Sequence, residues 1–132
     1  MVMPVITALY AGLLGLVGIV VAFRCGRLRG KLNVPIGDGG DRGLLLAMRR
    51  HANFTEWVPL ALILIALLEM NGVSHYAIHA LGAGLVIARI AHAMGLKPDT
   101  LTNPARFVGA AGTAVITLVA SIWAIVAFAT RQ

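Results

Sequence analysis

The sequence predicts an all-α integral membrane protein, a single domain of four spanning helices that covers residues 1–132. Of the 132 residues, 59% are hydrophobic and only 12% are charged, a composition far from that of soluble domains. The mean hydropathy is +0.88, and the apolar residues form four stretches that are each long enough to cross a bilayer. This length leaves no room for a second domain.

The expected helices are bounded by turn and capping residues. They run from Pro4 to about Arg27, from Arg42 to Met70, from Ser74 to Met94 and from Pro104 to Thr130. Asp41 and Asn103 are suitable N-caps for the second and fourth helices, Pro104 favours a helix start, and Gly95 is a suitable C-cap for the third. Glu69, at the far end of the second helix, is expected to be solvated at the membrane interface.

The basic residues are concentrated in one segment. The formal charge is +6, and seven of the eleven Lys and Arg residues lie between positions 24 and 50. Such a segment could bind nucleic acid, but beside an apolar span it is more typical of a cytoplasmic loop. We therefore expect no nucleic-acid partner, with residues 24–43 and 96–104 in the cytoplasm and both termini on the opposite side.

A polar stripe interrupts the start of the second helix. Arg49, Asn53 and Glu56 are spaced at i, i+4 and i+7, so they lie within about 60° of one another on a helix. A charge at mid-membrane depth costs about 2.5 kcal/mol or more. These side chains are therefore expected to be paired or to face a cavity.

Three further polar side chains belong to the same half of the bundle. Arg89 and His92 lie near the end of the third helix, and Arg106 lies at the start of the fourth. A simple ion pair with Glu56 would leave most of this positive charge uncompensated. The resulting pocket suits a small anion that also carries an amine; glutathione has this charge pattern, and other amphoteric anions fit equally well.

No metal site is expected. His75 and His79 are spaced at i and i+4, as helical metal ligands are, but no carboxylate or thiolate stands beside them in the sequence. Cys25, the only cysteine, implies no disulfide framework.

The polar stripe resembles the second-helix signature of the MAPEG family, the membrane-associated proteins in eicosanoid and glutathione metabolism. That signature reads Arg, three residues, Asn, two residues, Glu, two or three residues and Pro, and here those places hold Arg49, Asn53, Glu56 and Pro59. The resemblance extends to Arg27-Leu28-Arg29, to Arg89-Ile90-Ala91-His92 and to Arg106. It covers nearly the whole chain.

This resemblance implies a homotrimer that binds glutathione, its cosubstrate, between neighbouring subunits near the cytoplasmic face. The glutathione-binding residues carried over are Arg27, Arg49, Asn53, Glu56, Arg89 and His92. Arg106 matches the arginine that stabilises the glutathione thiolate in the family's synthases. A nearby guanidinium lowers the pKa of a thiol, and the thiolate would attack a lipophilic electrophile dissolved in the membrane lipid.

Departures from the family narrow the expected activity. The prostaglandin-type enzymes have an arginine and a serine where this chain has Ala52 and Phe107. The sequence therefore favours a membrane-bound glutathione S-transferase-like enzyme, with glutathione peroxidase activity also open, over a dedicated prostaglandin or leukotriene synthase. The alternatives are a non-enzymatic lipid-binding scaffold and a small proton-coupled transporter using Glu56, although surrounding arginines would keep that carboxylate ionised.

Overall fold

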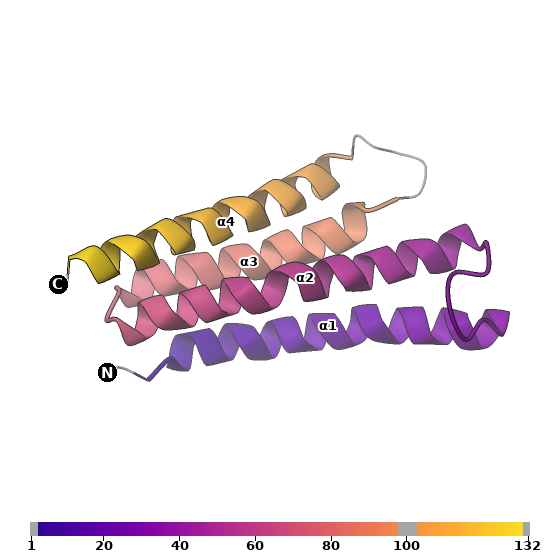
Figure 1. The fold of residues 1–132 in the computed structure, drawn as a ribbon, viewed down its shortest axis with the longest axis horizontal. Coiled ribbons are helices and arrows are strands. Elements are labelled where there is room, and N and C mark those ends of the chain that lie inside the picture. Colours follow the sequence, from indigo (N-terminus) through magenta and orange to yellow (C-terminus); the bar gives the residue numbers. More distant parts are fainter. Residues whose placement is uncertain (1–2, 98–102, 131–132) are drawn as a thin grey trace.

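The computed structural model describes residues 3–97 and 103–130, which form a bundle of four α-helices (Figure 1). The helices are α1 (Val5–Leu32), α2 (Arg42–Met70), α3 (His75–Gly95) and α4 (Pro104–Ala129). All four are long and apolar enough to cross a membrane. These helices confirm the predicted all-α membrane fold.

Successive helices run in opposite directions, so the connections alternate between the two ends of the bundle (Figure 1). The start of α1, the α2–α3 turn and the end of α4 lie at one end. The loop between α1 and α2, the end of α3 and the start of α4 lie at the other, which we call the loop end. The predicted exit from the third helix is described as far as Lys97, and Pro98 lies outside the described residues.

The predicted N-caps are confirmed. Asp41 Oδ1 accepts a hydrogen bond from the Leu44 backbone N–H at 2.7 Å. Asn103 Oδ1 accepts from the Ala105 N–H at 2.9 Å and from the Arg106 N–H at 3.4 Å. Both side chains satisfy amides that have no partner within their own helix, and the second one fixes the turn from which Arg106 projects.

The first helix continues five residues beyond the expected end at Arg27. It ends at Leu32, where Asn33 adopts the left-handed conformation with φ 53°, as residues after helix ends often do. The Arg29 guanidinium then donates to three loop carbonyl oxygens, those of Val34, Pro35 and Gly37. At about 1.5 Å per residue, α1 is roughly 42 Å long, so its basic end extends beyond a hydrocarbon core of about 30 Å.

Glycines bring α3 and α4 into close contact near the loop end. A Cβ at Gly95 would collide with the backbone of Ala105 and Arg106, and one at Gly109 with the backbone of Ala88 and His92. Gly95 is the last helical residue and Leu96 is the C-cap, so the predicted capping role of Gly95 is wrong. Close approach of the two helices is what requires a glycine there.

The expectation that Glu69 is solvated is also wrong. Its side chain is only 2% exposed, and its carboxylate accepts hydrogen bonds from the Ile6 N–H at 2.8 Å, the Thr7 N–H at 2.7 Å and the Thr7 hydroxyl at 2.6 Å. These amides belong to the first turn of α1 and lack partners within it. Glu69 therefore caps α1 from the end of α2, where a negative charge also interacts favourably with the helix dipole.

Candidate functional site

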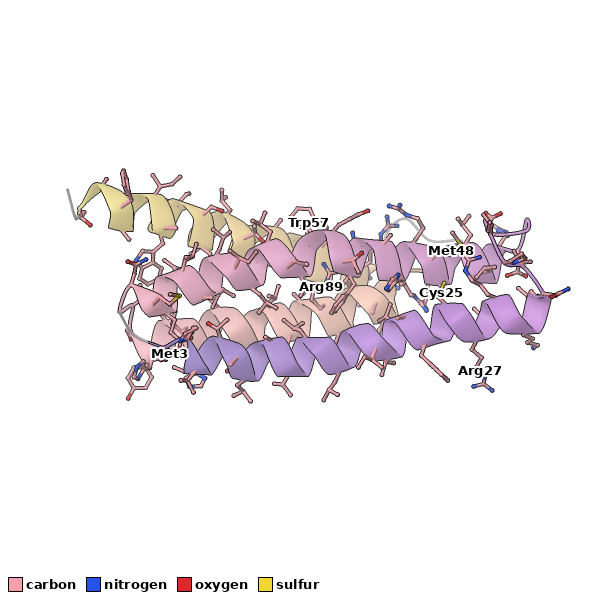
Figure 2. All side chains as sticks on the ribbon, turned by 60° about the horizontal axis from the view of Figure 1, so that its bottom comes forward. Met3, Cys25, Arg27, Met48, Trp57 and Arg89 are labelled. Carbon is pink, nitrogen blue, oxygen red and sulfur yellow. The ribbon has the colours of Figure 1, made fainter. Side chains whose placement is uncertain are left out.

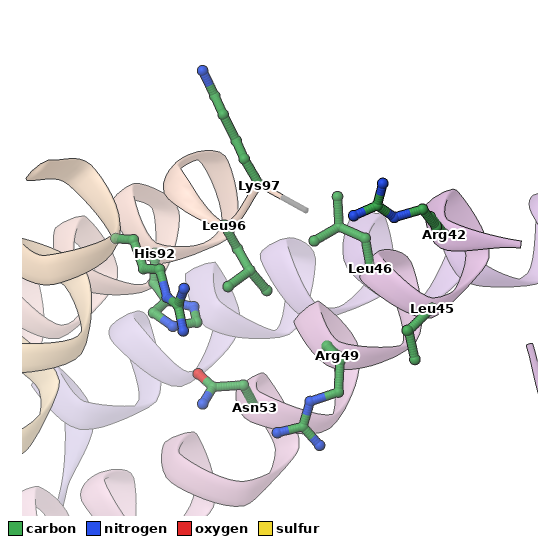
Figure 3. Close-up of a pocket in the computed structure, with 9 residues that line it drawn as sticks. Arg42, Leu45, Leu46, Arg49, Asn53, His92, Leu96 and Lys97 are labelled. Atoms are coloured by element: carbon green, nitrogen blue, oxygen red, sulfur yellow. The ribbon is translucent and has the colours of Figure 1, made fainter. Parts of the chain in front are cut away.

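A cavity of about 330 Å³ opens at the loop end between α2, α3 and α4 (Figure 3). It is lined by Arg42, Leu45, Leu46, Arg49, Asn53, His92, Leu96, Lys97 and Arg106. Its volume lies near the lower end of the roughly 300–1,000 Å³ found for small-molecule sites. All the charged side chains among these lining residues are basic, so the cavity favours an anion.

Four of the predicted site residues meet in this cavity: Arg49, Asn53, His92 and Arg106. Arg42 and Lys97 also line it but were not predicted. Arg42 precedes Arg49 by seven residues and therefore shares its helix face, which is a signal that could have identified it. Lys97 follows the end of α3, so helical periodicity does not predict where its side chain points.

Arg89 lies behind the cavity and does not line it. The side chain is 2% exposed and lies inside the bundle (Figure 2). Its Nη2 donates to Asn53 Oδ1 at 2.6 Å, and its Nη1 donates to Thr113 Oγ1 at 3.4 Å. Both acceptors are neutral, and the buried Nε has no hydrogen-bond partner in the described part of the chain. Arg89 therefore holds the Asn53 side chain in place.

The bond from Arg89 determines what Asn53 offers a ligand. A guanidinium only donates hydrogen bonds, so the Asn53 atom that it contacts must be the carbonyl oxygen. The Nδ2 group, with two N–H donors, remains for the cavity. Together with the basic side chains, it makes the cavity a set of hydrogen-bond donors suited to carboxylates and peptide carbonyl groups.

Contacts between helices hold the wall of the cavity in place. His92 is only 5% exposed and packs directly against Gly109 of α4. Arg50 Nη2 donates to the Leu96 carbonyl oxygen at 2.6 Å, which ties α2 to the end of α3. The positions of His92 and Leu96 thus depend on tertiary contacts from two different helices.

Besides Arg89, two further predicted site residues do not line this cavity in the described chain. Arg27 and Glu56 are both exposed and neither lines the cavity. The Arg27 side chain projects from α1 away from the other helices (Figure 2). In the described chain the Arg89 guanidinium donates to Asn53 and Thr113 and not to Glu56.

At the opposite end of the bundle, His75 and His79 of α3 make no metal site with other described residues. No group of three or more His, Cys, Asp or Glu side chains within residues 3–97 and 103–130 is arranged to hold a metal ion. His79 Nδ1 is instead hydrogen bonded to the Tyr10 hydroxyl at 2.8 Å. This bond joins α3 to α1.

The fold and the site together define an integral membrane protein of four spanning helices with a basic cavity at one end of the bundle. The chain belongs to the MAPEG family, whose family model matches residues 7–126. It is similar to the inner membrane protein YecN of Escherichia coli K12, with 38% identity over 90 residues, which are 68% of this chain and 69% of the relative. YecN of Escherichia coli O6:H1 shows the same identity and coverage. No solved structure matches this chain.

Proposed function

We propose that this protein binds glutathione in the cavity at the loop end and acts as a membrane-bound glutathione S-transferase-like enzyme. The observation that carries the proposal is the meeting of Arg49, Asn53, His92 and Arg106 in one basic cavity of a MAPEG-family chain. Glutathione has two carboxylates and peptide carbonyl groups, which match the donors of the cavity. Arg49 binds a carboxylate and Asn53 Nδ2 binds a peptide carbonyl oxygen.

The exposed positions of Arg27 and Glu56 fit a homotrimer with glutathione between neighbouring subunits. Glutathione also carries an ammonium group, and no carboxylate lines the cavity among the described residues. In the proposed assembly, Arg27 and Glu56 act at the boundary between two subunits, where Glu56 binds the ammonium. With residues 24–43 and 96–104 in the cytoplasm, as the positive-inside rule favours, the cavity opens toward cytoplasmic glutathione.

The proposed chemistry takes place at the glutathione sulfur. Arg106 stabilises the thiolate and lowers the pKa of the thiol, which releases its proton to water. The thiolate then attacks a carbon of a lipophilic electrophile, forming a sulfur–carbon bond while the leaving group departs with the bonding electrons. With a lipid hydroperoxide, the thiolate instead attacks the terminal oxygen and breaks the O–O bond, which forms a glutathione sulfenic acid and releases the lipid as an alkoxide that takes a proton to become the alcohol. A second glutathione thiol then reacts with the sulfenic acid to give glutathione disulfide and water.

Equilibrium binding of glutathione to the detergent-purified protein tests the first step. Arg49→Ala is expected to weaken binding about 10- to 100-fold, the loss of a charge-assisted hydrogen-bonded contact of about 1.5–3 kcal/mol. Lys31→Ala, which removes an exposed charge from α1 outside the cavity, is the matched control and is expected to bind normally. Absence of binding to the unmodified protein at millimolar glutathione would refute the proposal.

The role of Arg106 is tested separately with an aromatic halide as electrophile. Arg106→Ala is expected to retain the fold and bind glutathione but to lose both turnover and the ultraviolet absorption of bound thiolate. Glutathione binding without turnover by the unmodified protein would support a non-enzymatic scaffold. Proton-coupled efflux from vesicles that is lost in Glu56→Gln would support a transporter.

A further inference from the structure

A second hollow, of about 550 Å³, lies between α1, α2 and α3 on a different face of α2 from the glutathione cavity. We call it the α1–α3 groove. Its wall is aliphatic side chains and Met94, with two arginines, Arg24 and Arg50, at the loop end. It shares no lining residue with the cavity at the loop end, so the two hollows are separate candidate binding sites.

The groove has the depth of part of one bilayer leaflet. Along α1 its lining extends from Leu16 to Arg24, a rise of about 12 Å along a helix, whereas half a hydrocarbon core is about 15 Å thick. Several wall residues are exposed on the outside of the bundle, including Val20, which is 68% exposed, and Met94, which is 71% exposed. The hollow therefore lies in the region that lipid chains fill, with its charged end toward the headgroups.

The charged end lacks anionic compensation within the described chain. No acidic side chain lines the groove among the described residues, and Arg24 lies close enough to Arg50 for their charges to repel. Arg50 donates to the neutral Leu96 carbonyl oxygen, and its buried Nε has no hydrogen-bond partner in the described part of the chain. An anion at the mouth of the groove would offset this repulsion and accept charge-assisted hydrogen bonds.

We propose that the α1–α3 groove binds an anionic phospholipid, with the phosphate between Arg24 and Arg50 and one acyl chain along the aliphatic wall. Basic pockets between spanning helices are recognised sites for anionic headgroups, and here the basic pair continues directly into an apolar channel. A zwitterionic headgroup is less suitable because its ammonium group adds a third positive charge beside the two arginines. Charge and depth together thus select an anionic lipid.

Native mass spectrometry and thermal unfolding of the detergent-purified chain test this site with phosphatidylglycerol and phosphatidylcholine of identical acyl chains. Phosphatidylglycerol is expected to be retained and to raise the Tm. Arg24→Ala is expected to weaken its retention about fivefold, which corresponds to about 1 kcal/mol per basic residue near the surface. Val20→Trp, which fills the groove and leaves its charge unchanged, is expected to prevent retention. Lys31→Ala is the charge-matched control on α1 and is expected to behave as the unmodified protein.

Several outcomes would overturn the lipid proposal. One is equal retention of the two lipids, and another is an equal loss of retention in Arg24→Ala and Lys31→Ala. If free glycerol phosphate raises the Tm as much as phosphatidylglycerol does, the two arginines bind a soluble anion and not a lipid. If no lipid is retained and Val20→Trp changes the oligomeric mass, the groove holds a second copy of the chain.

Discussion

Removing Asn53 alone is predicted to destabilise the bundle more than removing Asn53 and Arg89 together. Arg89 is 2% exposed, and its short bond is the one to Asn53 Oδ1, at 2.6 Å against 3.4 Å to Thr113. A hydrogen bond to a charged group contributes about 1.5–3 kcal/mol. Asn53→Ala leaves the guanidinium buried without this acceptor, so the free energy of unfolding should fall by about 2–4 kcal/mol.

The double variant Asn53→Ala with Arg89→Met removes the buried guanidinium together with its acceptor. Met keeps an unbranched apolar side chain in the space of the arginine stem, and replacing both partners of a buried polar contact with apolar groups is often close to neutral. Its free energy of unfolding should therefore fall by less than about 1.5 kcal/mol. The difference from the single variant is a coupling energy between the two side chains.

Reversible denaturant unfolding in mixed micelles measures this coupling on the unmodified protein, both single variants and the double variant. Thr55→Ala is the control on the same turn of α2. Thr55 is exposed, and its hydroxyl donates only to carbonyl oxygens of its own helix, so its loss should change stability by less than about 0.5 kcal/mol. A double variant that is as unstable as the sum of the two single variants would refute the reasoning.

Three further predictions concern the contacts that hold the bundle together. Glu69→Gln should lower the Tm in detergent more than Thr7→Val does. Glu69→Gln weakens the cap on the Ile6 and Thr7 amides of α1, whereas Thr7→Val removes only the hydroxyl bond. Equal shifts in Tm would contradict the capping role of Glu69. Gly109→Ala should separate α4 from α3 and weaken glutathione binding. The control Gly12→Ala, whose new Cβ has nothing within 4 Å, should be neutral or stabilising by up to about 1 kcal/mol. If both variants behave alike in thermal unfolding and glutathione binding, α3 and α4 do not depend on close contact at Gly109. Arg29→Ala should release the α1–α2 loop from three carbonyl contacts and speed its cleavage in limited proteolysis, and an unchanged cleavage rate would show that these bonds do not order the loop.

Part of the candidate site followed directly from helical spacing. Arg49 and Asn53 are one turn apart on α2, so a helix alone puts them on one face, and both line the cavity. The same spacing also included Glu56, which the described chain leaves exposed and outside the cavity. A stripe of about 60° is wide enough for one edge to face the bundle and the other to face outward.

The roles of Arg89 and Glu69 could not be deduced from local patterns. Both are charged residues in apolar helices, and the sequence interpretation treated the first as a ligand contact and the second as solvated. Arg89 bonds Asn53, 36 positions away, and Glu69 is not solvated but caps amides that are 62 and 63 positions away. Such partners depend on how the helices pack, which no periodicity within one helix specifies.

The sequence by itself determined the four apolar spans, the capping residues Asp41 and Asn103, and the concentration of basic residues at one end of the bundle. These features are local, since hydropathy, cap chemistry and helical spacing depend on neighbouring residues along the chain. Only the tertiary structure decided that Gly95 and Gly109 bring α3 against α4, and that His92 and Arg106 therefore share a cavity with Arg49. The physical reason is that a cavity is the space left between packed helices, and its walls come from residues that the sequence keeps far apart.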